Sequence, residues 1–366
     1  MKILIIAELF PRGGTYSAVI KLLRLHNELG YEQILLIQKK MVIPELANYC
    51  DQIGVKLRIC PDRPPLMQIP LFSLFYDCLL QFFYVWTIRH DIIVVSNSHS
   101  WMLIGILAFK NNKVFYLTHS FPNRHLHRLF SPLYMLTAKL DRNKRFGTVS
   151  EYAKKENVNY LKLESKKVDV IYNSFNNELI QSDPNVNGNV VLTVGRINPV
   201  KNPIIWLKVV DKATKKKPST KFIWVGADEE QMKQMSNKIK EKGLVENIQI
   251  IKYDSNLFDY YSRASIYFQP SLSESHGIAV IDAMAAGLPC VVSNVGGMPE
   301  SVAGNETGFI CESSDVEGFS EKISLLVSDT KLAREFGEKG RRRVRKLFSE
   351  ETQKKKLKSI YEVISA

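Results

Sequence analysis

The 366-residue sequence predicts an α/β protein with two doubly wound domains, each a parallel sheet between layers of helices. The first observation is length, because a single hydrophobic core rarely extends beyond about 250–300 residues. The second is a series of short runs rich in β-branched residues and separated by helix-length segments, as expected for buried parallel strands. The third is composition: 45% apolar and 24% charged residues argue against a disordered or fibrous chain.

The predicted strands fall into two series with a break between them. The break is Ile180–Gly188, which is rich in Pro, Asn, Asp and Gly and is followed at once by a new strand. We therefore predict a first Rossmann-like domain over residues 1–182, a second over residues 188–348, and a C-terminal helix over residues 349–366 that returns to the first domain. The ten predicted strands are KILIIAEL, QILLIQ, DIIVVSN, KVFYLTH, RFGTVS, NVVLTVGR, KFIWVGA, IQIIK, SIYFQPS and PCVVSN.

The net charge of +13 is concentrated in the first half of the chain. Residues 1–180 hold 23 Lys and Arg against 14 Asp and Glu, whereas residues 181–366 hold 27 against 23. Such a surface suits nucleic acid, anionic lipid or a phosphorylated substrate. No zinc-finger spacing or RNA-binding aromatic motif accompanies the charge, so we expect no nucleic acid partner.

Cysteine usage and the N-terminus favour a cytoplasmic protein. The five cysteines lie far apart without metal-ligand spacing, and we interpret them as reduced, buried thiols. The first apolar run is short and is interrupted by Glu8, which indicates a first β-strand and not a signal peptide.

One segment, Leu66–Trp86, is apolar over about the length of a membrane span. Pro70 breaks the run and Asp77 lies near its middle, which argues against a spanning helix. Two interpretations stay open: a buried crossover helix, and a helix that lies in a bilayer surface. Basic residues at 124–128 and 139–145 favour the surface helix, since anionic lipid attracts such clusters, although a solvated charged face explains them as well.

The most informative segment is Ser271–Glu300. A polar loop with Glu274 follows a strand, Gly277 permits close approach of the backbone to a ligand, and a helix then begins at Ile278. The first N–H groups of a helix have no intrahelical partner and its dipole is positive there, so a diphosphate fits. Asp282 stands eight residues after Glu274, about two helical turns on, and two such carboxylates can bracket a nucleotide sugar.

Three other strand ends carry polar or glycine residues. Arg196 and Lys201 follow one strand, and two cations opposite a helix N-terminus neutralise the charge that grows on a departing diphosphate, so that no metal is required. Gly13 and Gly14 follow the first strand and allow a tight turn at its carboxyl end. The absence of a G-x-G-x-x-G sequence there argues against a dinucleotide cofactor. His119 ends a further strand.

These motifs resemble retaining glycosyltransferase family 4 of the bacterial cell-surface polysaccharide type. That family has the GT-B fold, two Rossmann-like domains that face each other across a cleft. Ser271–Glu300 resembles its Glu-x7-Glu region in the Pro-Ser entry, the glycine before the helix and the Gly-Gly-x-Pro-Glu turn. The sequence departs from the family pattern at two positions. Asp282 stands where the second residue is usually glutamate, and His276 stands where an aromatic residue is common. The resemblance spans nearly the whole chain, and its specific motifs lie within residues 190–300.

The resemblance implies retaining, metal-independent transfer of a sugar, without a cofactor, from a UDP- or GDP-linked donor to a saccharide or lipid-linked saccharide. Glu274 and His119 are then catalytic, Asp282 binds the ribose, and Gly13 and Gly14 form a cleft loop. The donor diphosphate is held by Arg196, Lys201, Gly277, Ile278 and Ala279. The first domain binds the acceptor and the second the donor, in capsule, O-antigen or lipopolysaccharide synthesis. With a basic first domain, we expect peripheral contact with anionic lipid at the inner face of the cell membrane.

Two alternatives remain at this point. A nucleotide-sugar epimerase of the same fold needs a fuller acid/base set than the sequence offers. A non-catalytic sugar- or lipid-binding protein on a degraded scaffold is suggested by Asp282 and His276, whereas Arg196, Lys201 and Glu274 argue against it.

Overall fold

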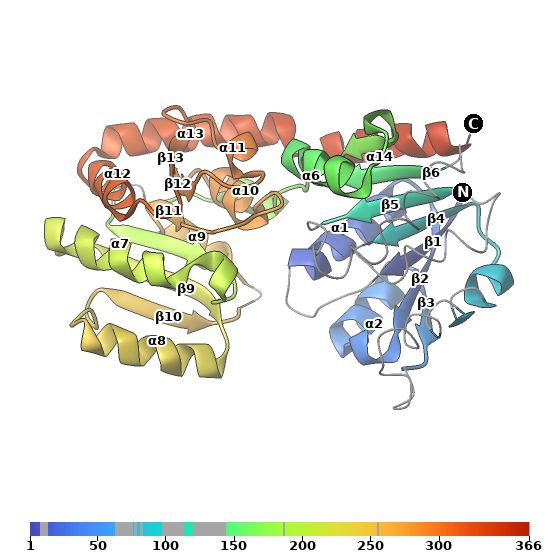
Figure 1. Cartoon of the computed structure of the whole chain (residues 1–366), viewed down its shortest axis with the longest axis horizontal. Coiled ribbons are helices and arrows are strands. Elements are labelled where there is room, and N and C mark those ends of the chain that lie inside the picture. Colours follow the sequence, from blue (N-terminus) through green and yellow to red (C-terminus); the bar gives the residue numbers. More distant parts are fainter. Residues whose placement is uncertain are drawn as a thin grey trace. The chain divides into compact units, whose positions relative to one another are not determined.

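The structure is a computed structural model that describes residues 1–7, 14–62, 76, 79–80, 83–96, 113–119, 144–185, 187–254 and 256–365. The chain divides into two compact units (Figure 1). Unit 1 comprises Met1–Ile171 and Gln353–Ala366, and unit 2 comprises Tyr172–Thr352.

A parallel sheet forms the centre of unit 1, with seven strands among the described residues. These strands are β1 (Lys2–Ala7), β2 (Glu32–Gln38), β3 (Lys56–Cys60), β4 (Ile92–Ser96), β5 (Val114–Thr118), β6 (Lys144–Thr148) and β7 (Val168–Val170). Their order is β3-β2-β1-β4-β5-β6-β7, so the direction of winding reverses between β1 and β4. Sheets of this kind bind ligands at the carboxyl ends of the strands beside the reversal.

Helices cover both faces of this sheet. The described helices of unit 1 are α1 (Gly14–Glu28), α2 (Pro44–Gln52), α6 (Glu151–Leu161) and most of α14 (Glu350–Ser365). Side chains of β1 alternate between the faces: Ile3 and Ile5 pack with α1, α2 and α14, whereas Leu4 and Ile6 pack on the opposite face. The C-terminal helix therefore contributes to the core of unit 1, where Tyr361 is fully buried.

The sheet of unit 2 has six parallel strands, counted over the described part of the chain. They are β8 (Val190–Val194), β9 (Lys221–Ala227), β10 (Ile248–Lys252), β11 (Ile266–Gln269), β12 (Cys290–Ser293) and β13 (Gly308–Cys311). The order β10-β9-β8-β11-β12-β13 reverses between β8 and β11. The carboxyl ends of these two strands are therefore the expected ligand edge of unit 2.

Helices form two layers around this second sheet. Its described helices are α7 (Pro203–Lys216), α8 (Glu229–Glu241), α9 (Phe258–Arg263), α10 (Ile278–Ala285), α11 (Met298–Ser301), α12 (Val316–Ser328) and α13 (Thr330–Leu347), with the short 3₁₀ helices η5 (Asn177–Gln181) and η6 (Pro199–Lys201). One core joins α7, α8 and α12 around Trp206 and Trp224. The other joins α9, α10 and α11 around Tyr267 and Ile281. Unit 2 is thus a three-layer α/β/α sandwich.

The prediction of two doubly wound parallel sheets is confirmed, and all ten predicted strands are present. Three described strands were missed: β3, β7 and β13. Each lies at an edge of its sheet. β3 exposes Lys56, Arg58 and Ile59, and β7 carries Asp169, so neither has the continuous apolar run of a strand buried on both faces. β13 is apolar but has only four residues.

The division between the units lies earlier in the chain than the predicted break at Ile180–Gly188. Phe175 and Leu179 pack in the same core as α10, and the backbone N–H of Phe175 donates to the carbonyl of Phe348 (3.3 Å). These contacts place the segment from Tyr172 onward in unit 2. Residues 353–366 belong to unit 1.

Most of the apolar segment Leu66–Trp86 lies outside the described residues. Among those described, Phe83 is 58% and Trp86 75% exposed, whereas Val85 is buried. No described helix is long and apolar enough to cross a membrane. The basic residues at 124–128 also lie outside the described part of the chain.

Candidate active site

The candidate site lies at the carboxyl ends of β8 and β11, where the strand order of unit 2 reverses. The chain after β8 forms η6, which ends at Lys201, and the chain after β11 forms the loop that carries Glu274 and leads into α10. The backbone N–H of Leu272 donates to the carbonyl of Val200 (2.7 Å), which joins the two loops. Two segments far apart in the sequence are thereby fixed side by side.

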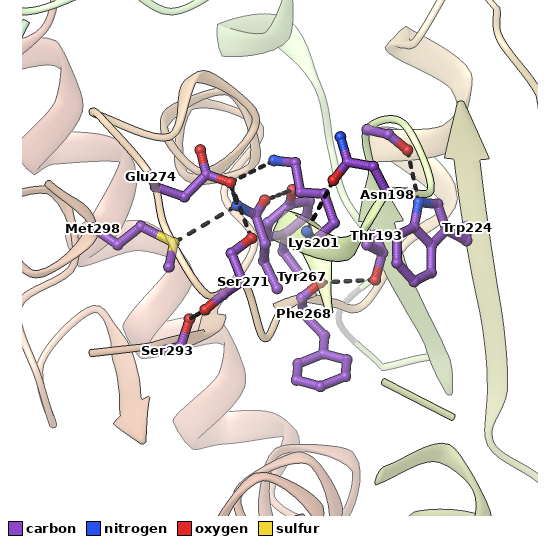
Figure 2. Close-up of polar contacts among 12 residues, drawn as sticks. Thr193, Asn198, Lys201, Trp224, Tyr267, Phe268, Ser271, Glu274, Ser293 and Met298 are labelled. Atoms are coloured by element: carbon purple, nitrogen blue, oxygen red, sulfur yellow. Dashed lines mark hydrogen bonds and ion pairs between the residues drawn. The ribbon is translucent and has the colours of Figure 1, made fainter. Parts of the chain in front are cut away.

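Three donors converge on one carboxylate oxygen of Glu274. Its Oε1 lies 2.6 Å from Lys201 Nζ, and it accepts hydrogen bonds from Ser271 Oγ (2.9 Å) and Gln269 Nε2 (2.8 Å). The side chains of Lys201 and Glu274 are only 18% and 14% exposed. Figure 2 shows the second oxygen, Oε2, directed away from Lys201, and no described residue donates to it. Glu274 therefore keeps one fixed oxygen and one that is open to a ligand.

A buried hydrogen bond fixes the amide of Gln269. The hydroxyl of Tyr267 donates to Gln269 Oε1 (2.6 Å), and both side chains are fully buried. Burial raises the pKa of Tyr267 well above its usual range, and the nearby Cys290 and Glu274 add to this effect, so the hydroxyl keeps its proton. Because Oε1 of Gln269 faces Tyr267, its Nε2 faces Glu274.

The backbone of Glu274 is held by the glycine turn that precedes α11. The N–H of Gly297 donates to the carbonyl of Glu274 (3.0 Å), and a Cβ atom on Gly296 would overlap that carbonyl oxygen. Ser293 Oγ donates to the carbonyl of Ser271 (2.6 Å). This close approach explains why the Gly-Gly pair follows the Glu274 loop in the sequence.

The N-terminus of α10 lies directly after this loop. Gly277 precedes the helix at φ +85°, a left-handed conformation that favours glycine. Among the described residues, nothing accepts a hydrogen bond from the N–H groups of Ile278 and Ala279. The hydroxyl of Tyr261 donates to the carbonyl of Ala279 (3.2 Å) and so ties this first turn to α9. The predicted anion-binding amides are therefore held in place and available.

The loop that carries Lys201 is fixed by its own side-chain bonds. Asn198 Oδ1 accepts the backbone N–H of Lys201 (3.1 Å), and Trp224 Nε1 donates to the carbonyl of Gly195 (2.7 Å) (Figure 2). Arg196, in contrast, is exposed and forms no ion pair with a described residue. Of the two predicted cations, Lys201 is thus engaged with Glu274, whereas Arg196 faces solvent.

Two other positions of the motif make contacts that the sequence did not predict. Asp282 Oδ1 accepts the backbone N–H of Asn176 (2.7 Å), so the second carboxylate holds the segment that enters unit 2. His276 is buried between the rings of Tyr172 (5.1 Å between centroids) and Phe348 (4.9 Å). At this position the imidazole packs where an aromatic residue is common in the family that the sequence resembles.

The remaining predicted residues belong to unit 1. His119 follows β5, and its Nε2 lies 3.2 Å from the hydroxyl of Ser96 at the end of β4. Gly14 is the first residue of α1, and Gly13 lies outside the described residues.

Sequence reasoning missed Tyr267, Gln269 and Ser271 as contributors to the site. Gln269 was detectable in principle, because it is the polar residue in the otherwise apolar strand IYFQ and a buried amide requires hydrogen-bond partners. The identity of those partners depends on side-chain reach, which the sequence does not contain.

The arrangement combines groups suited to an anion with one suited to hydroxyls. Lys201, Arg196 and the amides of Ile278 and Ala279 are donors of the kind that bind phosphate. The open oxygen of Glu274 is an acceptor for hydroxyl groups. Within the described residues, no group of three or more His, Cys, Asp or Glu side chains is arranged to hold a metal ion.

Comparison with known families agrees with this chemistry. Residues 174–343 match the family described as Glycosyl transferases group 1. Unit 2 carries a glycosyl transferases group 1 domain. The matched residues include Arg196, Lys201, Gln269, Glu274 and the N-terminus of α10.

The curated relatives match this chain over part of their length. The capsular polysaccharide biosynthesis glycosyltransferase CapM of Staphylococcus aureus is 34% identical over 115 residues, which are 31% of this chain and 30% of CapM. The chain thus spans less than a third of the length of this relative.

Solved glycosyltransferase structures share the fold of the whole chain. A glycosyltransferase from Rickettsia africae ESF-5 superposes with a TM-score of 0.80 at 22% identity, over 99% of this chain and 98% of that one. Anabaena Alr3699/HepE in complex with UDP superposes with a TM-score of 0.78 at 16% identity, over 99% and 100%. The predicted GT-B fold, with its two Rossmann-like parallel-sheet domains, is confirmed.

Proposed function

We propose that this chain is a retaining, nucleotide-sugar-dependent glycosyltransferase of family 4. The observation that carries the proposal is the Lys201–Glu274 pair (2.6 Å) beside the open N-terminus of α10 in the group 1 domain. Lys201, Arg196 and the amides of Gly277, Ile278 and Ala279 hold the donor diphosphate. Oε2 of Glu274 accepts hydrogen bonds from the sugar hydroxyls.

Transfer then needs no metal and no separate protein base. The bond between the anomeric carbon and the diphosphate breaks, and the acceptor oxygen bonds to that carbon on the same face. The acceptor proton passes to the leaving phosphate oxygen. Lys201 and Arg196 stabilise the negative charge that develops on the nucleoside diphosphate.

In the absence of donor, Glu274 neutralises the cation that the diphosphate requires. Donor binding must therefore exchange one anionic partner of Lys201 for another, which costs part of the ion-pair energy. An intact donor offers sugar hydroxyls to Glu274 in return, whereas the nucleoside diphosphate product offers none. The pair thus favours binding of the donor over retention of the product.

The finer assignments follow from the relatives and from the sequence. HepE binds UDP and CapM acts in capsular polysaccharide biosynthesis, which support a UDP-linked donor, with GDP as the second choice, and a saccharide or lipid-linked acceptor. Asp282 contacts the ribose in this proposal while it also holds the Asn176 amide. The catalytic role of His119 and the cleft role of Gly13 and Gly14 stay predictions.

We also propose peripheral attachment to anionic membrane on the cytoplasmic side. The net charge of +13 and the exposed Phe83 and Trp86 support this. Co-sedimentation with vesicles that contain anionic lipid, and none with neutral vesicles, is the expected result. Equal recovery in the supernatant with both vesicles would contradict membrane attachment and leave the transferase proposal untouched.

A donor panel tests the proposed function. The purified chain is incubated with UDP-glucose, UDP-galactose, UDP-N-acetylglucosamine or GDP-mannose, with and without a mixture of bacterial lipid-linked saccharides, and nucleoside diphosphate release is measured. We expect release that depends on the acceptor. Sugar isomerisation without an acceptor would indicate an epimerase, and neither turnover nor binding would indicate a non-catalytic protein.

A further inference from the structure

Tyr267, Gln269 and Glu274 form one hydrogen-bonded chain that leads from the core of unit 2 to the site. The Tyr267 hydroxyl donates to Gln269 Oε1 (2.6 Å), and Gln269 Nε2 donates to Glu274 Oε1 (2.8 Å). Tyr267 and Gln269 are both 0% exposed and both lie on β11, the central strand beside the reversal of the sheet. The chain therefore begins on a rigid element and ends on a carboxylate that is open to ligands.

The Gln269 amide has an oxygen that accepts and a nitrogen that donates, so the hydrogen-bonded chain from Tyr267 to Glu274 has a direction. A neutral tyrosine hydroxyl beside a carbonyl oxygen donates to it, so the amide nitrogen points at Glu274. An inverted amide would set its carbonyl oxygen against the Glu274 carboxylate, two acceptors without a proton between them. Tyr267 thus excludes the inverted orientation without touching Glu274.

The structure assigns Tyr267 and Gln269 as positioning residues that anchor one oxygen of Glu274 and so direct the other, Oε2, at the donor. The sugar donor as the ligand of Oε2 rests on the proposed function, whereas the anchoring of Oε1 does not. Among the described residues, Lys201, Ser271 and Gln269 donate to the carboxylate, and all three hydrogen bonds go to Oε1. Loss of one donor leaves the carboxylate with a wider range of rotamers.

The hydrogen bonds from Tyr267 to Gln269 and from Gln269 to Glu274 matter most when a diphosphate binds, because Lys201 then leaves Glu274 for the diphosphate. Ser271 and Gln269 are the neutral donors that remain on Glu274, and both are fully buried. A neutral amide stabilises the carboxylate without adding a second cation that would also attract the diphosphate. Glu274 therefore stays in place while Lys201 changes its ion-pair partner from Glu274 to the donor diphosphate.

Two variants and their combination test this assignment. Gln269→Met keeps the volume and removes the amide, and Tyr267→Phe keeps the ring and removes the hydroxyl. With the donor that the wild type prefers, we expect kcat to fall ~10-fold in each, since small displacements of a reacting group are costly. Because Tyr267 acts through Gln269, the double variant is expected to match Gln269→Met and not to multiply the two losses. Affinity for the nucleoside diphosphate is expected to stay unchanged.

Thr193→Val is the matched control. Thr193 is buried, donates to the carbonyl of Phe268 (2.7 Å) and accepts from Trp206 Nε1 (2.8 Å), so its loss removes comparable bonds on the neighbouring strand without contact to Glu274. We expect a lower melting temperature with wild-type kcat. A fall in kcat equal to that of Gln269→Met would show a general packing effect and overturn the assignment, as would wild-type kcat in Gln269→Met.

A second readout does not depend on turnover. In the full chain with isotope-labelled glutamine, the side-chain amide resonance of Gln269, identified by its absence in Gln269→Met, is expected to shift in Glu274→Gln and in Tyr267→Phe. An unchanged resonance would overturn the anchoring. If the wild type cleaves no donor, the proposed function fails, and this resonance still decides whether Gln269 holds Glu274.

Discussion

Each unit buries a tyrosine hydroxyl in a hydrogen bond, but the two bonds lead to different places. In unit 2, Tyr267 bonds Gln269 (2.6 Å), and the chain continues to the partly exposed Glu274. In unit 1, the hydroxyl of Tyr361 lies 2.7 Å from His26 Nε2, and both residues are fully buried between α14 and α1. Burial raises the pKa of both tyrosines well above the usual range, so both hydroxyls are neutral.

The comparison separates stability from function within one kind of interaction. A buried polar pair that ends in the core, such as His26 and Tyr361, stabilises the packing of two helices. A buried pair that ends at an open carboxylate at the reversal of a parallel sheet orients a group for a ligand. Substitutions in the His26–Tyr361 pair are therefore expected to change unfolding, and substitutions in Tyr267, Gln269 and Glu274 to change turnover.

The largest effect is expected for Glu274→Gln. The amide cannot carry the negative charge and offers the sugar a single acceptor atom, so kcat is expected to fall on the order of 10²- to 10³-fold, the range for loss of one preorganised polar group. Nucleoside diphosphate release with the preferred donor measures this. Glu321→Gln, an exposed carboxylate on α12, is the control and is expected to keep wild-type turnover. Equal rates for the two variants would remove Glu274 from the active site.

Lys201→Met is expected to act next most strongly. A hydrogen bond to a charged group contributes about 1.5–3 kcal/mol, so kcat/KM for the donor is expected to fall ~10- to 100-fold. Steady-state kinetics measure this, with Lys208→Met on the exposed face of α7 as the control. Equal kcat/KM for Lys201→Met and its control would contradict the donor-binding role of Lys201.

Tyr361→Phe is the corresponding change in unit 1. It removes the hydroxyl beside His26 Nε2 and leaves a buried imidazole nitrogen without a partner, which costs about 1–3 kcal/mol. The melting temperature is expected to fall by about 2–4 °C per kcal/mol, with unchanged turnover at lower temperature. A loss of kcat without a loss of stability would invert the comparison between the units.

The stability of unit 1 is also expected to depend on pH through His26. Burial lowers the pKa of His26 to about 3, whereas an unfolded chain protonates histidine near pH ~6.5. Between these values the unfolded state binds a proton that the folded state excludes, so the free energy of unfolding falls as pH falls, by up to about 1.4 kcal/mol per pH unit, and levels off below pH ~3. Urea unfolding measures the slope. His26→Gln, which does not titrate, is expected to have a flatter profile; identical slopes would exclude His26 as the cause.

The central strands were predictable, as were Glu274 and Lys201, whereas three of the four edge strands in the described sheets and the buried part of the site were not. Continuous apolar runs marked ten strands, whereas β3, with Lys56 and Arg58 exposed, lacks such a run because one side of an edge strand has no partner. Glu274 and Lys201 were predictable because both follow predicted strand ends, in motifs that resemble those of a known family. The polar side chain of Gln269 in an apolar strand marked the position, but its role was not predictable, because it depends on which side chains the amide reaches.

The backbone contact of Asp282 shows a further limit of spacing arguments. Its position on α10 was correctly inferred from the sequence, but the spacing gave no indication that Asn176 lies within hydrogen-bond distance. Contacts between residues so far apart in the chain depend on the tertiary fold, here on the packing of Phe175 and Leu179 against the same helix.

The most direct test of the donor site is calorimetric titration of UDP and of GDP into the wild type and Glu274→Gln. In the absence of ligand, the Glu274 carboxylate is paired with Lys201. The neutral amide of Glu274→Gln leaves the Lys201 ammonium free for the diphosphate and removes a negative charge that repels it. We predict that the wild type binds one of the two nucleotides and that Glu274→Gln binds it ~10-fold more tightly, a gain of about 1.4 kcal/mol. Failure of the wild type to bind either nucleotide, or equal or weaker binding by the variant, would contradict the exchange of Lys201 from Glu274 to the diphosphate.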